Sequence, residues 1–174
     1  SSAYLQNISH KEMKKNSDVC IIAYYDAGFA TVGDLAWDSM CRLAKAQGYD
    51  CRRFDRKQSD RPHSWEKILL IQQAFDKGYE FVFSIDADAM VIDLGQDIRA
   101  EIARAEKVAG GQRDFFVARH DINGKKSPNL GIIVARNTEF SKHLLNAMWD
   151  MERYVNHPWW EQAAFMDFFG LIDD

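Results

Sequence analysis

Two short and almost wholly apolar segments constrain the fold of this chain more than any other feature. Residues 19–25 read VCIIAYY and residues 79–85 read YEFVFSI, and each segment runs directly into an aspartate. Continuous apolar runs of this length fit β-strands that are covered on both faces, as in parallel sheets packed between helices. The chain is therefore expected to build a sheet from buried strands, with polar residues at the strand ends.

Segments with helical periodicity alternate with the strand-like segments. Thr31 and Asp34 have the spacing of a capping box at the start of the first helix, and Gly48 is a stop signal at its end. The expected elements in chain order are a strand at 19–25, a helix at 31–47, a strand at 49–54, a helix at 64–77, a strand at 79–85, a helix at 96–109, strands at 115–119 and 130–136, and helices at 141–155 and from 160 onward. This order predicts an α/β fold, in which a mainly parallel sheet is flanked by helices within a single domain over residues 1–174.

The loops after the first and third strands are where a ligand is expected to bind. Tyr24 and Asp26 lie at the end of the first strand, and Asp86 and Asp88 follow the third. The carboxyl ends of parallel strands meet at one edge of an open sheet, and such sheets bind ligands beyond that edge. These four residues are therefore predicted to lie near one site.

Asp86 and Asp88 form a D-x-D pair directly after an apolar strand. Two carboxylates at positions i and i+2 of an extended segment point to the same side, so both can face one cation. Mg²⁺ and Mn²⁺ prefer oxygen ligands and commonly combine one or two carboxylates with phosphate oxygens of a substrate. Without a cation the acids would repel a diphosphate, so the pair requires either a metal or protonation of the acids, and it predicts a metal site. A solvated turn is the alternative.

The charge and composition exclude several classes of protein. The formal net charge is −4, so the chain lacks the strongly basic face of a nucleic-acid-binding protein. No run of about 18 apolar residues predicts a membrane span, and residues 1–18 lack the apolar core of a signal peptide. We therefore expect a cytoplasmic protein or a soluble catalytic domain; residence in the Golgi lumen would require an N-terminal anchor that has been removed.

The cysteines and one sequon carry little functional signal. Cys20, Cys41 and Cys51 match no zinc or redox spacing and are predicted to be buried, reduced thiols. Asn7-Ile8-Ser9 has the spacing of a glycosylation sequon, but a match of three residues arises often by chance.

A second class of enzyme places the same acid pair after an apolar strand. Phosphatases of the haloacid-dehalogenase type usually carry Thr or Val two positions after the second aspartate, where this chain has Met90. Their pair normally follows the first strand of the domain, whereas here it follows the third. A metal-dependent phosphatase or nucleotidyltransferase is therefore a less favoured alternative.

Four short motifs occur in an order that resembles one glycosyltransferase family. They are Ser64-Trp65-Glu66-Lys67, Asp86-Ala87-Asp88, Asn129-Leu130-Gly131 leading to Val134-Ala135-Arg136-Asn137, and Glu161-Gln162-Ala163-Ala164. From about residue 18 to 169 the chain resembles the fungal galactosyl- and mannosyltransferases and the plant xyloglucan xylosyltransferases. The resemblance implies a GT-A fold, a UDP- or GDP-sugar donor, Mn²⁺ (or Mg²⁺), and transfer to a carbohydrate or glycoconjugate acceptor with retention of configuration.

The resemblance also implies roles for the first two motifs. Asp86 would contact the nucleotide ribose or the metal, and Asp88 would be a direct metal ligand. Lys67, in the first turn of its helix, would lie near the donor, where an ammonium group and a helix N-terminus both favour phosphate; a solvated lysine is the alternative. Trp65 would lie beside the nucleotide or in the core.

The third motif and the loop before it are expected to contact the transferred sugar. Gly131 lets backbone approach a ligand closely, and the Asn129 carboxamide offers a donor and an acceptor to sugar hydroxyls. A tight turn into a buried strand is the alternative for both. Asp121 could accept hydrogen bonds from the sugar, or it could belong to a hairpin turn, because Asn123-Gly124 is a strong hairpin signal.

Glu161 and Gln162 match the place where the family carries an acid or amide near the anomeric carbon. In a retaining enzyme they would stabilise oxocarbenium-like charge and orient the acceptor. In an inverting enzyme, Asp121 or Glu161 would be the candidate general base. Trp159 and Trp160 would either stack on a sugar ring or pack a helix against the sheet.

One departure from the family concerns its metal site. Members usually carry a histidine after the Glu-Gln motif, but this chain stops at Asp174, and His120, His143 and His157 do not match that position. The chain is then a short form, a truncated domain or a domain with weakened metal binding. A non-catalytic nucleotide-sugar binding module is accordingly an alternative to an active transferase.

Overall fold

The computed structural model describes residues 14–122 and 124–172, so the sequon at residues 7–9 lies outside the described residues. The strands are β1 (Val19–Tyr24), β2 (Asp50–Phe54), β3 (Phe81–Ile85), β4 (Phe115–Ile122) and β5 (Lys125–Arg136). The α-helices are α2 (Ala30–Gln47), α3 (Glu66–Asp76), α4 (Ile98–Ala109), α5 (Glu139–Asp150) and α6 (Trp160–Phe168), and the short 3-10 helices are η1 (Ala27–Phe29), η2 (His63–Trp65) and η3 (Glu152–Tyr154). The predicted alternation of strands and helices is confirmed.

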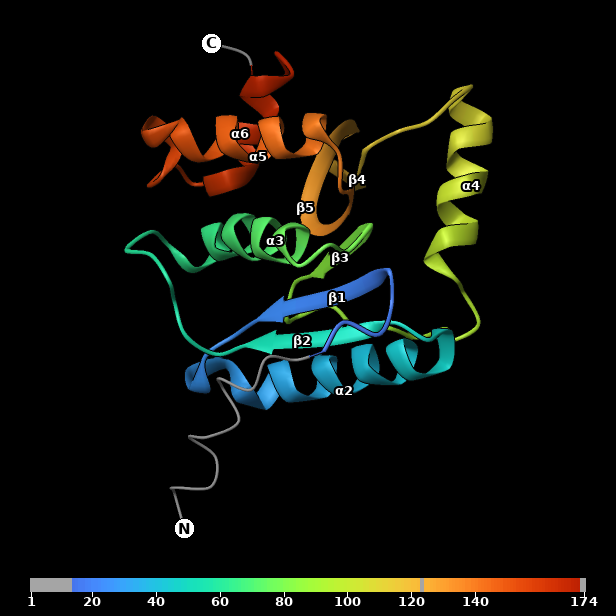
Figure 1. Ribbon diagram of the computed structural model, residues 1–174. Helices are drawn as coiled ribbons and strands as arrows, with labels where there is room; N and C mark the ends of the chain where they lie inside the picture. Colours follow the sequence, from blue (N-terminus) through green and yellow to red (C-terminus); the bar gives the residue numbers. More distant parts are fainter. Residues whose placement is uncertain (1–13, 123, 173–174) are drawn as a thin grey trace.

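The described strands form a five-stranded sheet in the order β2-β1-β3-β5-β4 (Figure 1). β1 pairs in parallel with β2 and with β3, whereas β5 is antiparallel to both of its neighbours, β3 and β4. Four strands therefore run in the same direction, which agrees with the predicted mainly parallel sheet. Because β2 and β3 lie on opposite sides of β1, the strand order reverses between β1 and β3.

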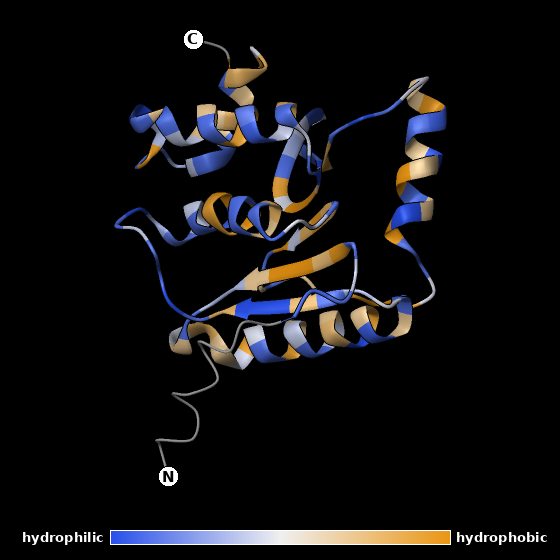
Figure 2. Cartoon of the chain, viewed as in Figure 1, coloured by the Kyte–Doolittle hydropathy of each residue, from blue (hydrophilic) through white to orange (hydrophobic). Residues whose placement is uncertain are grey.

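Alternating side chains of β1 take part in two hydrophobic cores. Cys20 and Ile22 belong to a core that includes α3, α5 and α6, whereas Val19, Ile21 and Ala23 belong to a core that includes α2. Successive side chains of a strand point to opposite faces, so a strand covered on both faces has to be apolar throughout. Figure 1 shows α2 on one face of the sheet and α3, α5 and α6 on the opposite face, and β1 is hydrophobic along its length in Figure 2.

The start of α2 differs from the expected capping box. Thr31 and Asp34 lie inside the helix, which continues directly from η1 without a side-chain cap. Asp34 instead accepts a hydrogen bond of 2.6 Å from the Tyr25 hydroxyl. The C-terminus of α2 is as predicted, because Gly48 follows it in the left-handed conformation with a φ of 73°.

The last two strands are longer than predicted and form a hairpin. Asp121 lies within β4, opposite Lys126 of β5, so the predicted hairpin is present, while a contact of Asp121 with the sugar stays a prediction. β5 lies between β3 and β4 in the sheet and pairs Ile132 with Ile85. This position brings residues 129–131 of β5 beside the carboxyl end of β3. No helix in the described part of the chain is long and apolar enough to cross a membrane.

Candidate functional site

A cavity of about 420 Å³ opens at the carboxyl ends of β1 and β3, where the strand order reverses. Open α/β sheets bind ligands beyond the carboxyl ends of their strands at such a point. The start of α3 forms another part of the wall. The lining residues are 22–26, Gly28, Phe29, His63, Ser64, Lys67, Leu70 and 84–88.

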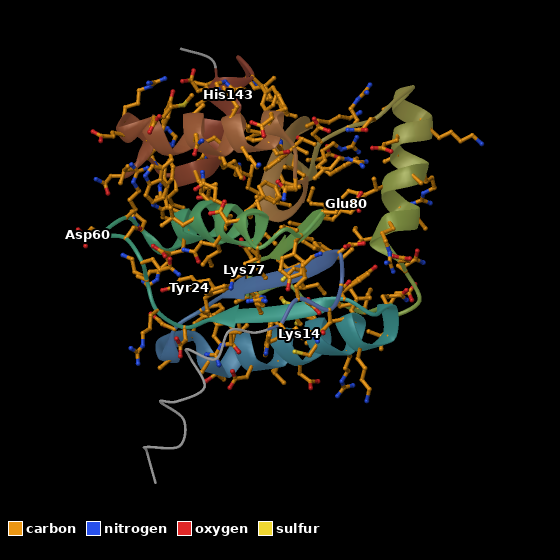
Figure 3. The ribbon with its side chains drawn as sticks, in the orientation of Figure 1. Lys14, Tyr24, Asp60, Lys77, Glu80 and His143 are labelled. Carbon is orange, nitrogen blue, oxygen red and sulfur yellow. The ribbon has the colours of Figure 1, made fainter. Side chains whose placement is uncertain are left out.

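Tyr24 and His63 form the wall of the cavity beside β1. The Tyr24 hydroxyl lies 2.8 Å from Nδ1 of His63, and the two rings stack with centroids 5.7 Å apart. Burial raises the pKa of Tyr24, as does the charge of Asp26, so the hydroxyl keeps its proton at neutral pH. Asp26 Oδ2 lies 3.9 Å from Nε2 of His63. Figure 3 shows Tyr24 at the carboxyl end of β1, so the predicted pair Tyr24 and Asp26 lies at the cavity.

The acid pair lies in a turn, not on the extended segment that the sequence predicted. β3 ends one residue before Asp86, and the amide of Ala89 donates to the Asp86 carbonyl at 3.0 Å. The amide of Asp86 donates to the Gly131 carbonyl at 2.8 Å, which fixes the first acid against β5. The turn keeps both acids at the site, because Asp86 and Asp88 both line the cavity.

Lys67 links the cavity to α6. Its Nζ lies 2.8 Å from Asp86 Oδ1 and 3.0 Å from Glu161 Oε1, and it donates to the Leu130 carbonyl at 3.0 Å. Lys67 is only 8% exposed, so it is not the solvated lysine of the alternative interpretation. Burial disfavours the charged ammonium group, but the carboxylates of Glu161 and Asp86 outweigh burial and raise the pKa of Lys67. Lys67 is therefore protonated at neutral pH.

Glu161 and Gln162 lie behind Lys67, at the amino end of α6. The Glu161 side chain is 6% exposed, and no described residue donates a hydrogen bond to its Oε2 atom. Gln162 Oε1 accepts a hydrogen bond of 3.3 Å from the Leu130 amide. Neither residue lines the cavity. Glu161 is connected to the cavity through Lys67, and Gln162 contacts the backbone of β5.

Asn129 and Gly131 lie within β5, close to Asp86. Asn129 Oδ1 accepts a hydrogen bond of 2.8 Å from the Gly131 amide, and Asn129 Nδ2 lies 3.0 Å from Nδ1 of His120. A Cβ atom at position 131 would lie 2.8 Å from Asn129 Oδ1 and 3.2 Å from Asp86 Oδ2. Glycine at this position therefore allows the Asp86 carboxylate to approach β5.

Two histidines of this region, His63 and His120, were not among the predicted site residues. Because an amide nitrogen only donates, Nδ1 of His120 accepts from Asn129, and the neutral ring carries its proton on Nε2. That Nε2 atom is buried without a partner among the described residues. The hairpin signal could have placed His120 near Asn129, and His63 directly precedes the motif that contains Lys67. Neither histidine has a local pattern that marks it as functional.

Other candidates lie outside the group around Lys67. The Asp121 side chain is 58% exposed, lies 4.0 Å from Arg119 and does not line the cavity. Trp65 is fully buried and donates from Nε1 to the Val155 carbonyl at 3.2 Å, so it belongs to the core. Trp159 and Trp160, in contrast, are 51% and 44% exposed.

The charges at the cavity determine which ligand it can accept. Asp26, Asp86 and Asp88 line it together with Lys67, whose ammonium group is shared with Glu161. Negative charge is in excess, so a diphosphate would be repelled unless a cation were also bound. Two carboxylates fit Mn²⁺ or Mg²⁺ when phosphate and water oxygens complete the coordination. Within residues 14–122 and 124–172 no group of three His, Cys, Asp or Glu side chains could hold a metal alone.

The sequence profile of one protein family, described as nucleotide-diphospho-sugar transferase, matches residues 21–170. The chain belongs to this family. Membership supports a role in glycosyl transfer and implies a nucleotide-sugar donor and an acceptor for this nucleotide-diphospho-sugar transferase. No curated protein sequence matches the chain at a significant level.

Among solved structures, this nucleotide-diphospho-sugar transferase is similar to a glycosyltransferase involved in the glycosylation of the major capsid of PBCV-1. The TM-score is 0.69 at 14% sequence identity, over 87% of this chain and 76% of that chain. The likeness shows a shared fold, and the predicted GT-A fold is confirmed. The narrower resemblance to galactosyl-, mannosyl- and xyloglucan xylosyltransferases stays a prediction.

Proposed function

We propose that this nucleotide-diphospho-sugar transferase is a metal-dependent glycosyltransferase. It would move a hexose or pentose from a UDP- or GDP-sugar to a hydroxyl group of a carbohydrate or glycoconjugate, with retention of configuration. The observation that carries the proposal is the acidic cavity at the end of β1 and β3, where Asp86 and Asp88 lie beside the first turn of α3.

The acid turn is the proposed metal site. Asp86 Oδ1 is paired with Lys67, so Asp86 Oδ2 and the Asp88 carboxylate are the oxygens proposed to hold the cation. A bound Mn²⁺ or Mg²⁺ would neutralise the charge of the diphosphate leaving group. Lys67 fixes the orientation of Asp86, and Gly131 leaves the space in which that carboxylate lies.

The nucleotide is proposed to lie along the wall beside β1. The stacked rings of Tyr24 and His63 offer an aromatic surface there, and the Asp26 carboxylate can accept hydrogen bonds from ribose hydroxyls or base N–H groups. The amino end of α3 adds positive potential beside the diphosphate, because helix N-termini favour anions.

The transferred sugar is proposed to lie between the acid turn and β5. Asn129 offers hydrogen-bonding groups there, and Gly131 lets the β5 backbone approach the sugar. Glu161 and Gln162 are proposed to stabilise positive charge that develops at the anomeric carbon. Because Glu161 is buried against Lys67, its role would be electrostatic, which suits retention better than proton abstraction from an acceptor. Asp121 is outside this proposed group.

The acceptor is proposed to approach over the start of α6. Trp159 and Trp160 are exposed there, directly before Glu161, and exposed indole rings offer apolar faces on which a sugar ring can stack. Trp160 also has a φ of 44°, a strained conformation for a residue other than glycine. Strained backbone is often found at ligand sites, where the surrounding structure holds it in place.

A non-catalytic nucleotide-sugar binding module is the second candidate function. The position of Glu161 behind Lys67 favours it, because this carboxylate does not line the cavity. A binding module would bind a UDP- or GDP-sugar without releasing the nucleoside diphosphate from the sugar. A transferase would release the nucleoside diphosphate, and more of it when an acceptor is present.

The two candidates are separated by incubating the protein with Mn²⁺ and UDP- or GDP-linked hexoses and pentoses, with and without a mixture of oligosaccharides. Release of UDP or GDP is measured. The proposal expects release, and it expects Gln162→Ala to lower the rate of release far more than the donor affinity. Binding without any release would support the binding module, and equal losses of rate and affinity would reassign Gln162 to ground-state binding.

A further inference from the structure

Two cysteines that are distant from the cavity lie in contact with each other. Cys41 of α2 and Cys51 of β2 have their Sγ atoms 3.6 Å apart, and both are free thiols. Both are partly exposed, so the prediction of buried cysteines holds for Cys20 and is wrong for this pair. The contact joins a helix to the strand on which it packs.

The surroundings of the pair allow a covalent bond between the two sulfurs. A disulfide has an S–S length of about 2.05 Å, so the Sγ atoms would have to move about 1.5 Å closer. Cys20, the remaining cysteine, belongs to the core on the opposite face of the sheet, while Cys51 packs against the core that includes α2. Cys20 therefore does not compete for either sulfur.

We propose that Cys41 and Cys51 are a modification site, at which a small-molecule disulfide such as oxidised glutathione converts the two thiols into an intrachain disulfide. The Cys41 thiolate attacks one sulfur of the oxidant, forms a mixed disulfide and releases one glutathione thiolate. Cys51 then loses its proton and attacks the Cys41 sulfur, which releases the second glutathione. The protein loses two electrons and two protons, and the oxidant becomes two thiols.

The order of these two steps follows from the surroundings of the sulfurs. Burial raises the pKa of Cys51, and the neighbouring Cys41 raises it further, so Cys51 stays a thiol while Cys41 meets the oxidant. Once the mixed disulfide has formed, the short distance between the sulfurs favours the second step over attack by an external thiol.

The bridge would tie α2 to β2 without involving the cavity. Cys51 lies opposite Ile21 in the β1–β2 register, whereas Tyr24, at the cavity, lies opposite Phe54. The proposal is therefore independent of the proposed glycosyl transfer. Closing the loop between the two cysteines restricts the unfolded chain and should raise the thermal stability of the oxidised protein.

The test uses the purified protein with oxidised glutathione, followed by unfolding, alkylation of free thiols, and mass spectrometry of the peptides. The expected result is one alkylated cysteine, Cys20, together with a Cys41–Cys51 linked peptide and a Tm about 5 °C above that of the reduced protein. Three alkylated cysteines, a stable glutathione adduct on Cys41, or a link to Cys20 would overturn the proposal.

Two variants serve as controls for this experiment. Cys41→Ser should give no linked peptide and no increase in Tm on oxidation, whereas Cys20→Ala should form the link as the unaltered protein does. A rise in Tm on oxidation of Cys41→Ser would contradict the assignment of the bridge.

Discussion

At the scale of single residues, the site depends on the ammonium group of Lys67. Its Nζ lies within 3.0 Å of two carboxylates, that of Asp86 in the cavity and that of Glu161 in the interior. An intact buried ion pair adds little net stability, but removing one partner leaves a buried charge without compensation. Glu161 is 4% exposed, so it would be such a charge.

Replacing Lys67 should therefore destabilise the fold. Lys67→Met is expected to lower the free energy of unfolding by about 3–5 kcal/mol, because Glu161 loses its buried partner. The double variant Lys67→Met with Glu161→Gln should regain most of that loss, as measured by urea denaturation. A double variant no more stable than Lys67→Met would show that the ammonium group does not hold Glu161.

The pH dependence of this contribution follows from the raised pKa of Lys67. A group whose pKa is raised by folding contributes stability that is fully present below its unfolded pKa, about 10.4 for lysine, and that is lost as the pH rises through the folded pKa. The difference in unfolding free energy between the unaltered protein and Lys67→Met should thus stay constant from about pH 8 to 10 and shrink above that range. Denaturation series at several pH values measure it. A difference that shrinks already below about pH 9 would indicate that folding lowers this pKa.

Gly131 is the second residue on which the acid turn depends. Gly131→Ala would place a Cβ atom 2.8 Å from Asn129 Oδ1 and 3.2 Å from Asp86 Oδ2. We expect the displaced carboxylate to weaken Mn²⁺-dependent UDP or GDP binding roughly tenfold, which corresponds to about 1.4 kcal/mol. Gly95→Ala is the matched control, because its Cβ would meet only the side chain of Asp93, at 3.2 Å and outside the cavity. Equal affinities of the two variants would exclude this role for Gly131.

At the scale of elements, the sequence could predict the strands and the edge of the sheet that carries the site. The run at 19–25 is apolar because the strand is buried on both faces, and it is followed by Asp26. A polar residue at the carboxyl end of such a strand predicts the edge of the sheet at which a ligand binds. The position of β5 between β3 and β4 could not be predicted, because strand order depends on packing between distant segments. The contacts of Gly131 with Asp86 and of Glu161 with Lys67 arise from that packing. Local patterns therefore find the acids but not the residues that hold them.

A buried acid, Glu66, binds the loop between β2 and α3 through three hydrogen bonds. Glu66 accepts hydrogen bonds from the Gln58 amide at 2.8 Å, the Ser59 amide at 3.2 Å and the Ser59 hydroxyl at 2.6 Å. Glu66→Ala should lower the free energy of unfolding by roughly 2–3 kcal/mol, because bonds to a charged acceptor are lost. Hydrogen exchange of the Gln58 and Ser59 amides should become faster.

The matched control for this loop is Glu80→Ala. Glu80 is an exposed acid directly before β3, and Figure 3 shows it far along the sheet from Tyr24. Neither the unfolding free energy nor the exchange of the loop amides should change in this variant. Unchanged exchange in Glu66→Ala as well would mean that the loop is held by other contacts.

At the scale of the whole molecule, local charge and overall charge have the same sign. The net charge of the whole chain is −4, and the cavity is lined by three aspartates and one lysine. Long-range attraction therefore cannot bring a nucleoside diphosphate to this site, and a bound cation has to provide the attraction locally.

The single-domain arrangement over residues 1–174 stays a prediction, while family and fold agree on a nucleotide-sugar transferase.

The most direct test is calorimetric titration with UDP and GDP, in Mn²⁺ and again in EDTA. The account predicts that one nucleotide binds at least tenfold more tightly with Mn²⁺, a difference of about 1.4 kcal/mol or more, and that Asp88→Asn folds normally but loses this gain. Equal affinity with and without Mn²⁺, or an Asp88→Asn protein that keeps the full gain, would contradict a cation held by the acid turn.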